Sequence, residues 1–271
     1  MPYLCKSHIA ASGGTSSRDK RLTVCLREDG FSFAETTPDG RLQSFGEAEG
    51  RHASTMTGTL ADVKQFLGGV GIKPLGYARM QLVVMSRHST WVPDELYSSA
   101  SNRSYLRLAG VQPDGVAVCH SERLASTAVF SANEQTVTAF KVAMPGVSVM
   151  NQHALLAGLA PLFAGCAAIV SHWRDGLVDV AAFHDGRYLV GNTFACGTAE
   201  EAVYRLVDVM KSYSLEQAGA RLLLCGKVDQ QVYEACCPYF PEVDLFAGTG
   251  TPEQDAAFDG FPFYEHALLL I

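Results

Sequence analysis

Runs of basic residues are absent from this 271-residue chain, which carries 21 Lys and Arg against 28 Asp and Glu, a net charge of −7. Non-specific nucleic-acid binding needs clustered cations that neutralise phosphates, so this pattern predicts no nucleic-acid partner. No apolar stretch has the length of a membrane span, because the longest candidate, 154–170, is interrupted by two glycines and a proline. The first residues also lack the charged-then-apolar order of an export signal.

Cysteine occurs eight times but never in the CxxC spacing of metal and redox sites. Most of these cysteines lie inside apolar runs, as small buried thiols do. The adjacent Cys236 and Cys237 cannot both face one metal from a helix, so we interpret them as packing residues. Together with the missing export signal, this usage predicts a reduced, cytoplasmic protein with no metal site.

Familiar catalytic patterns are missing as well. The chain has no Gly-Lys-Ser/Thr phosphate loop, no Gly-x-Ser-x-Gly elbow and no His-Glu-x-x-His helix. Gly69-Val-Gly71 does not complete a dinucleotide loop, because Pro74 follows it. The composition, 48% hydrophobic and 18% charged, is that of a globular protein of one or two domains. No catalytic residue is assigned from these patterns.

What the sequence does contain is a repeated hairpin pattern. Asp29-Gly30, eight residues and Asp39-Gly40-Arg41 recur 146 positions later as Asp175-Gly176, eight residues and Asp185-Gly186-Arg187. Asp-Gly is a common turn dipeptide because both residues tolerate positive φ, so chance is the alternative to duplication. Both copies, however, follow a strand-like apolar run and precede the same series of predicted elements. The pattern therefore favours two related halves.

The coarse organisation follows from this repeat. We predict a flexible start at 1–20, rich in Ser, Gly, Lys and Arg, a first lobe at 21–150 and a second lobe at 151–271. Each lobe is expected to contain three strands, a helix, a strand, a helix and a strand. A cleft between two such lobes is where ligands usually bind.

Individual elements are predicted from apolar periodicity and from cap or turn residues. The best-marked helix, 199–213, has a capping box of Thr198 and Glu201. Another is expected to begin at Pro93, and the rest cover 59–67, 152–163 and 229–237. Strands are expected over 22–45 (a three-strand meander), 80–87, 116–120, 136–142, 188–194, 222–225 and 243–246. The apolar C-terminal residues predict an edge strand or core plug, with a partner-docking tail as the alternative.

This succession of elements, given twice, resembles the actin-like ATPase superfamily, which duplicates a ribonuclease-H-like unit. The stretches Asp29–Phe33, Trp91–Tyr97 and Phe194–Met210 are also similar to an uncharacterised bacterial family with this fold. The resemblance covers about residues 20–250. It implies an α/β (α+β) fold of two ribonuclease-H-like lobes in an actin-like ATPase architecture, and it carries no established activity.

The resemblance also implies where a nucleotide site would lie. Active members place an Asp-x-Gly turn after the first strand of each lobe, where backbone amides hold phosphates and the Asp positions hydrated Mg²⁺. Matching the two hairpins puts Leu26 and His172 at the Asp positions. The same match puts Glu28 and Arg174 at the Gly positions.

These replacements predict the loss of Mg-ATP hydrolysis. A Glu28 carboxylate beside a phosphate would cost about 4 kcal/mol per pair of unit charges at ~4 Å near a protein surface. The adenosine-side Gly-Gly motif is half retained, as Gly226 followed by Lys227, and we interpret Lys227 as a surface residue rather than a phosphate ligand. Asp29 and Asp175 are close enough to serve as substitutes if the alignment slips by a residue.

A histidine pair in the second hairpin suggests a different site. His172 and His184 could form a metal or acid/base site with the neighbouring acids Asp175, Asp179 and Asp185. On a strand, His172 and Arg174 share one face, whereas His184 lies beyond the next strand. A polar hairpin surface is therefore the simpler interpretation.

The leading hypothesis is a catalytically inactive actin-like protein that acts as a cytoplasmic adaptor for a protein partner. The alternative is a nucleotide-dependent enzyme, an ATPase or small-molecule kinase with displaced catalytic residues, and a weaker one is a ligand sensor. No cofactor is expected under the first hypothesis, and ATP with Mg²⁺ is expected only under the alternative. The sequence specifies neither the partner nor the oligomeric state.

Overall fold

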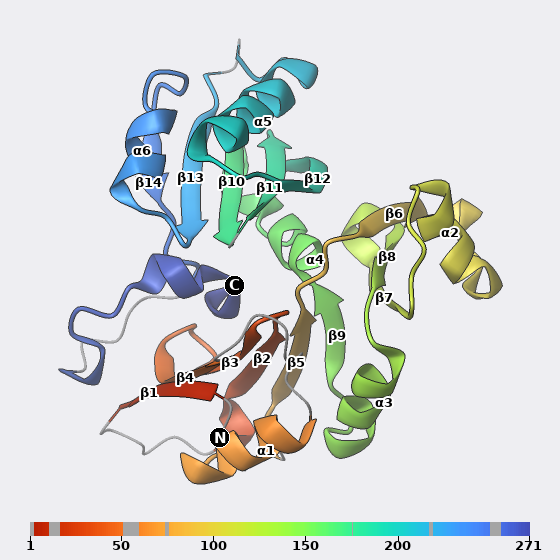
Figure 1. Ribbon diagram of the computed structural model, residues 1–271, viewed down its shortest axis with the longest axis vertical. Helices are drawn as coiled ribbons and strands as arrows, with labels where there is room; N and C mark the ends of the chain where they lie inside the picture. Colours follow the sequence, from red (N-terminus) through yellow and green to blue (C-terminus); the bar gives the residue numbers. More distant parts are fainter. Residues whose placement is uncertain are drawn as a thin grey trace. The chain divides into compact units, whose positions relative to one another are not determined.

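The computed structural model describes residues 3–10, 17–50, 60–73, 76–174, 176–216, 219–249 and 256–271 (Figure 1). The chain divides into two compact units, which we call the first and second lobes. The first contains the described residues of Met1–Gln152 and Gly250–Phe261 together with Leu270, and the second contains His153–Thr249, Pro262–Leu269 and Ile271. Each lobe has its own sheet and its own hydrophobic core.

The first lobe is built on a six-stranded sheet with the order β1-β4-β3-β2-β5-β9. The predicted meander is present as β2, β3 and β4, which are antiparallel, while β5 and β9 run parallel to β2. Phe33 and Leu82 from this sheet share one core with Phe140. The strand bounds are β1 Tyr3–Ile9, β2 Arg21–Leu26, β3 Gly30–Thr36, β4 Leu42–Gly50, β5 Arg79–Val84 and β9 Ser148–Asn151.

The N-terminal segment differs from the flexible start that we predicted. β1 pairs with β4 along its whole length, from Tyr3 opposite Gly50 to Ile9 opposite Ser44. The Ser- and Gly-rich composition that suggested flexibility belongs mostly to residues 11–16, which lie outside the described residues. Tyr3–Ile9 is instead the edge strand of the sheet, ordered by backbone pairing with β4, a partner that composition does not reveal.

The two helices of the first lobe's main sheet are α1 (Leu60–Gly69) and α3 (Glu134–Ala143). The prediction of a strand over 136–142 was wrong, although its β-branched residues favour one. Asn133 accepts a hydrogen bond from the Thr136 N–H (2.9 Å) and so caps a helix. Val137 and Phe140, three residues apart, are then both buried on one helical face, and this packing outweighs strand propensity.

A smaller module is inserted between β5 and α3. It comprises α2 (Asn102–Leu108) and a three-stranded antiparallel sheet in the order β6-β8-β7, with β6 at Ser89–Pro93, β7 at Val116–Ser121 and β8 at Ser126–Ser131. The helix expected from Pro93 does not begin there, because Pro93 ends β6. A 3₁₀ turn, Asp94–Leu96, follows, and α2 begins only at Asn102. The module has its own small core around Val92, Leu106 and Val129.

The second lobe repeats the topology of the first. Its sheet has the order β12-β11-β10-β13-β14, which corresponds strand by strand to β4-β3-β2-β5-β9, with the same parallel and antiparallel pairs (Figure 1). The strands are β10 Ala167–Arg174, β11 Leu177–His184, β12 Arg187–Ala195, β13 Arg221–Gly226 and β14 Val243–Leu245. The helices are α4 Gln152–Ala157, α5 Ala199–Ser212 and α6 Gln230–Cys236.

The strongest helix prediction is confirmed by α5. Thr198 Oγ1 accepts a hydrogen bond from the Glu201 N–H (3.2 Å), and Glu201 Oε2 accepts one from the Gly197 N–H (2.7 Å). The apolar face of this helix packs with Leu222 and Leu224 of β13 in the core of the second lobe.

The C-terminal segment was assigned entirely to the second lobe by the sequence, but the structure places 256–261 with the first. There the Phe261 ring packs edge-on against Phe45 of β4, with centroids 4.9 Å apart, and His8 of β1 lies 5.3 Å from Phe261. The last residues form a 3₁₀ segment, Phe263–Leu270, and not an edge strand. Ala267–Leu270 are buried, as the predicted core plug requires.

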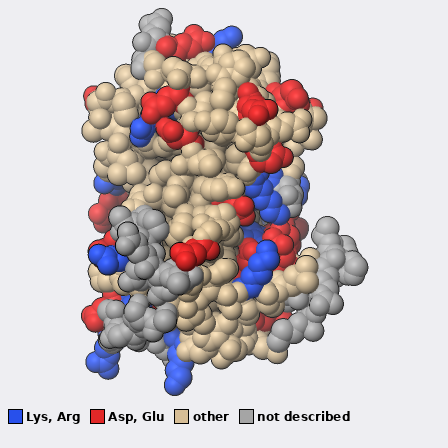
Figure 2. All heavy atoms as spheres, turned by 90° about the vertical axis from the view of Figure 1, so that its left-hand side faces the viewer, with Lys and Arg blue, Asp and Glu red and all other residues tan. Residues whose placement is uncertain are grey.

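Charged side chains of both signs are interspersed with uncharged surface on the face drawn in Figure 2. Within the described residues, no helix combines the length and the apolar character needed to cross a membrane.

Candidate functional site

The candidate site positions lie at the carboxyl ends of two corresponding strands, β2 in the first lobe and β10 in the second. Ligands of open α/β sheets bind at the carboxyl ends of their parallel strands. In the first lobe these ends belong to β2, β5 and β9, and in the second to β10, β13 and β14. The positions singled out in the sequence, from Leu26 to Glu28 and from His172 to Arg174, are therefore located where the fold usually binds ligands.

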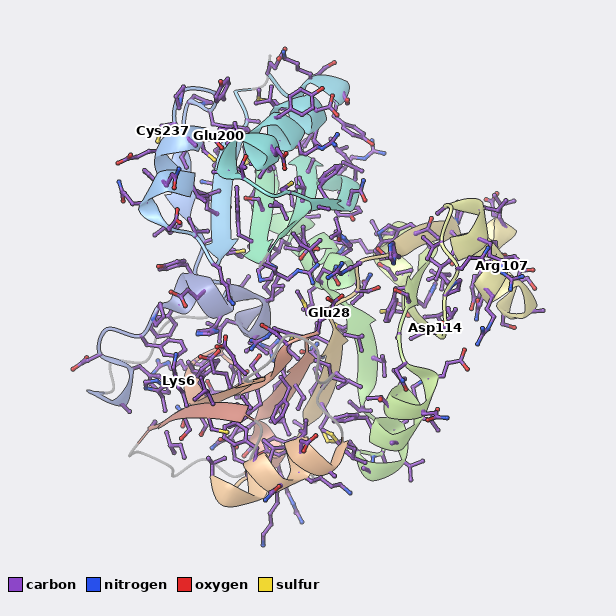
Figure 3. All side chains as sticks on the ribbon, in the orientation of Figure 1. Lys6, Glu28, Arg107, Asp114, Glu200 and Cys237 are labelled. Carbon is purple, nitrogen blue, oxygen red and sulfur yellow. The ribbon has the colours of Figure 1, made fainter. Side chains whose placement is uncertain are left out.

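The turn after β2 is held by ion pairs on its two central residues. Glu28 accepts two hydrogen bonds from Arg87, which follows β5, at 2.7 Å from Nε and 2.6 Å from Nη2 (Figure 3). Arg27, the residue before, donates from Nε to Asp29 Oδ1 at 3.0 Å, and its other nitrogens lie 3.9 Å from carboxylates of Glu47 and Glu49. Asp29, which we considered as a substitute magnesium ligand, is thus already the partner of Arg27.

Ladder hydrogen bonds show which residues of the two lobes correspond. The Met85 N–H donates to Leu26 O at 2.9 Å, and the Lys227 N–H donates to Trp173 O at 2.9 Å. Leu26 lies opposite Val84 of β5, as Trp173 lies opposite Gly226 of β13. The counterpart of Leu26 is therefore Trp173, and the pairing of Leu26 with His172 taken from the sequence repeat was wrong by one residue.

The one-residue error has a physical cause in the turns. Gly30 is already the first residue of β3, whereas Gly176 sits inside its turn with φ +68°. The same dipeptide therefore occupies different positions in the two hairpins, and the sequence match follows the dipeptide instead of the strands. The corrected correspondence pairs Cys25 with His172 and Arg27 with Arg174. Asp175 itself lies outside the described residues.

The second lobe contains a buried polar cluster beneath its first hairpin, which we call the Asp179 cluster: His153, His172, Arg174, Asp179 and Thr193. Asp179 is fully buried and accepts from Arg174 Nη2 (2.8 Å), Thr193 Oγ1 (2.6 Å) and His172 Nδ1 (3.1 Å). Asp179 lies opposite His172 in the β10–β11 ladder and opposite Thr193 in the β11–β12 ladder, which brings these side chains to one face.

Charge and hydrogen bonding fix the protonation of the Asp179 cluster. Burial raises the pKa of Asp179, but the hydrogen bond from His172 and the charge of Arg174 outweigh it and hold the pKa well below its usual range. Because the Thr193 hydroxyl donates to Asp179, it can only accept from His153 Nε2, 2.9 Å away. Burial lowers the pKa of His153, which keeps this imidazole neutral. Its Nδ1 has no hydrogen-bond partner among the described residues.

The metal interpretation of the histidine pair receives no support from this geometry. His184 ends β11 at the far end of the strand from the Asp179 cluster, opposite Arg187, and Asp185 Oδ1 accepts a hydrogen bond from the Gly165 N–H (3.0 Å). Among the described residues, no three His, Cys, Asp or Glu side chains are grouped to hold a metal ion.

Sequence reasoning missed two members of the Asp179 cluster. Thr193 could have been found from strand register, because it falls in the predicted strand that follows Asp179. His153 carried no signal, since it enters from α4 and its contact with Thr193 depends on tertiary packing.

Gly226, the retained half of the adenosine-side motif, has a structural role of its own. Its φ is +84°, and a Cβ at this position would lie 2.2 Å from Trp173 O and 3.0 Å from the His172 ring. Only glycine permits this approach of β13 to β10. Packing between β13 and β10 therefore accounts for a glycine at this position without a bound nucleotide.

The doubled topology and the placement of these turns define the class of protein. Both lobes have the ribonuclease-H-like strand order, and the molecule has the actin-like ATPase fold, as predicted. A Bacteroides thetaiotaomicron protein with actin-like ATPase fold and unknown function superposes with a TM-score of 0.70 at 18% identity, over 94% of this chain and 97% of that one. The PilM-PilN type IV pilus biogenesis complex contains a chain that matches with a TM-score of 0.57 at 8% identity, over 93% of this chain and 98% of that one.

The sequence gives the family itself. Residues 14–243 match the model of a family described as protein of unknown function (DUF3822), and the chain belongs to this family. No curated protein matches it by sequence.

Proposed function

We propose that the protein is a catalytically inactive member of the actin-like fold and acts as a cytoplasmic, protein-binding adaptor. The observation that carries the proposal is the corresponding pair Arg27 and Arg174. By the resemblance, Arg174 stands where active relatives have the phosphate-loop glycine, and Arg27 is its counterpart in the strand ladder of the first lobe. Each arginine is paired with a carboxylate of its own lobe.

The metal side of the site supports the same conclusion. Mg²⁺ prefers oxygen ligands, chiefly carboxylates and waters. The strand ends offer Cys25 or Leu26 in the first lobe and His172 in the second, none of which is a carboxylate. A cation placed ~4 Å from an arginine near the protein surface would be repelled by about 4 kcal/mol, so Asp29 and Asp179 are poor replacements while their arginines remain.

A protein-binding role is supported by fold analogy. A chain with this fold belongs to a structure named as the PilM-PilN type IV pilus biogenesis complex, so this scaffold can serve in a protein assembly. The analogy extends to the kind of role and gives no partner for this chain.

Thermal unfolding with and without Mg-ATP tests the proposal. A nucleotide at ~100 times its dissociation constant stabilises a binder by about 2.7 kcal/mol, or roughly 5–10 °C for a protein of this size. We expect no shift of the melting temperature with Mg-ATP or Mg-ADP up to millimolar concentrations.

The rival hypothesis, a nucleotide-dependent enzyme with displaced residues, makes the opposite prediction. It requires a shift of at least 5 °C that disappears in Glu28→Arg or Arg174→Glu. Lys211→Glu, an exposed change on α5 away from the strand ends, is the matched control and should keep any such shift.

A further inference from the structure

In the part of the chain that the structure describes, the outer edge of β12 is unpaired, whereas the corresponding edge in the first lobe is covered by a strand. β4 corresponds to β12, and its outer side is paired along seven residues with β1. Within the described residues, no strand pairs with the outer side of β12. Accordingly, the first seven residues of β4 are all buried, while every residue of β12 is exposed or half-buried.

Ladder geometry identifies the backbone groups on this edge. The Cys196 N–H donates to Gly176 O, which turns Phe194, Asn192 and Val190 toward β11. The N–H and C=O groups of the alternate residues Gly191, Thr193 and Ala195 therefore face outward.

The protection of this edge is slight. The Asn192 side chain accepts a hydrogen bond from the outward Thr193 N–H (2.9 Å). The outward amides of Gly191 and Ala195 meet no backbone acceptor among the described residues and can donate to an added strand. β12 is nine residues long and contains no lysine and no proline, the residues that commonly protect exposed edges.

Two arginines lie near the ends of the open edge, and the Glu201 carboxylate, which accepts from the Gly197 N–H, lies near the second of them. Arg187 begins β12, and Arg205 of α5 lies with its guanidinium 5.6 Å from the Phe194 ring of β12. Both arginines are exposed, and neither forms an ion pair with any described residue. β12 itself contains no acidic residue, although the whole chain has a net charge of −7.

In the first lobe, the strand that pairs with the corresponding edge carries a charge opposite to that of the edge. There β4 carries Glu47 and Glu49, and the added strand β1 supplies the opposite charge in Lys6, whose Nζ lies 3.5 Å from Glu47 (Figure 3). Lys6 and Glu47 are direct partners in the ladder. The charges at β12 have the reverse sign, so the strand that complements them is acidic.

From this comparison we propose that β12 is the docking edge for an extended, acidic segment of a partner protein, which adds to the second lobe as β1 adds to the first. Backbone hydrogen bonds to Gly191 and Ala195 would supply affinity, and carboxylates facing Arg187 and Arg205 would supply specificity. The inference rests on the proposed protein-binding function and gives it a surface and a partner chemistry.

The first test selects random ten-residue display peptides on the full-length chain. Ala195→Pro removes an outward N–H without breaking the ladder to β11, so it should abolish enrichment while leaving the melting temperature unchanged. Enriched peptides should alternate β-branched residues with Asp or Glu. If the same peptides are enriched equally on Ala195→Pro, the edge is not the docking site, although the absence of a nucleotide shift would still support the adaptor role.

A charge reversal provides the second test. Arg205→Glu should weaken binding of an enriched acidic peptide at least tenfold and shift the selection toward Lys- and Arg-containing peptides. Arg107→Glu, an equal charge change on α2, is the control and should alter neither result (Figure 3). If Arg205→Glu selects the same peptides as the wild type, the proposal of an acidic partner segment is wrong. It is also wrong if sedimentation shows a wild-type dimer that Ala195→Pro converts to a monomer, because the strand bound at β12 would then come from a second copy of the chain.

Discussion

The two lobes place an arginine at the same point of the same topology but pair it with acids from different strands. In the first lobe Arg27 faces Asp29 of the turn and Glu47 of β4, and its side chain remains one-fifth exposed. In the second lobe Arg174 faces Asp179 of β11, whose side chain is completely buried. Both lobes therefore have an arginine at this turn, but the carboxylates that pair with it come from different strands in the two lobes.

The strand ladders show where the acidic residue lies in each lobe. Ser32 of β3 lies opposite Glu47 of β4, and the corresponding pair in the second lobe is Asp179 opposite Thr193. The acidic and hydroxyl side chains have exchanged strands between the lobes. Because Arg27 of the first lobe is one-fifth exposed whereas Asp179 of the second is completely buried, substitutions at this ladder position should have very different costs in the two lobes, and this difference can be measured.

The largest effect is expected at Asp179. Asp179→Asn removes the charge that compensates buried Arg174, and breaking a buried pair from one side costs about 3–5 kcal/mol of unfolding free energy. Ser32→Ala, at the corresponding position of the first lobe, should cost about 1 kcal/mol or less. Urea unfolding measures the loss of unfolding free energy in each variant. Equal losses would show that the Asp179 cluster contributes no more to stability than the corresponding position of the first lobe.

The next effect is expected at Gly226, whose counterpart in the first lobe is Val84. Gly226→Ala combines positive φ with a 2.2 Å contact to Trp173 O, so we expect a loss of about 3 kcal/mol. Gly176→Ala also has positive φ but meets no described atom within 4 Å, and it should cost about 1 kcal/mol. Thermal unfolding should separate the two, and a mild Gly226→Ala would reopen a ligand-related reason for this glycine.

A smaller effect concerns the acid sensitivity that His153 gives to the second lobe. Because the pKa of His153 is lowered in the folded state, the unfolded chain binds more protons below the ordinary histidine pKa of about 6.5. Stability should then fall as pH drops from 7.5 to 5.5, by at most about 1.4 kcal/mol per pH unit for one proton.

The variant His153→Gln should flatten this pH dependence, because glutamine can still donate to Thr193 but does not titrate. His184→Gln, an exposed histidine at the end of β11, should leave the slope unchanged. The Asp179 contribution is distinct, since its lowered pKa gives stability that is present above about pH 4 and is lost only at lower pH. A slope that persists in His153→Gln would assign the acid sensitivity to another group.

The smallest effect is expected for Glu28 and Arg87. Both side chains are about half exposed, and surface ion pairs contribute roughly 0–1 kcal/mol despite two short hydrogen bonds. A double-mutant cycle with Glu28→Gln and Arg87→Gln should give a coupling below about 1 kcal/mol that weakens in high salt. A larger, salt-insensitive value would mean that the turn after β2 is as strongly held as the hairpin above Asp179.

Much of the fold could be predicted from local signals. The apolar runs before the Asp-Gly turns mark β2 and β10, and the Thr198–Glu201 capping box marks α5. The failures came where a distant partner decides the structure. Residues 136–142 form a helix because Phe140 packs into the lobe's core, and β1 is a strand because β4 is available to it.

The candidate site was less predictable for a related reason. His172, Arg174 and Asp179 could be named because they are close in sequence, but their partners Thr193 and His153 are brought in by strand register and by a helix. A one-residue difference in turn placement was enough to misalign the two halves. Matching the motifs aligned the two Asp-Gly dipeptides, whereas the register of the strands determines which side chains are neighbours.

The pairing of β1 with β4 has a consequence for the order of events during synthesis. Tyr3–Ile9 is translated about 40 residues before its partner, Leu42–Gly50. At about 5–20 residues per second, the ribosome needs several seconds to deliver that partner. For that time, Tyr3–Ile9 lacks its partner β4 and presents unpaired backbone to any protein near the exit of the ribosome.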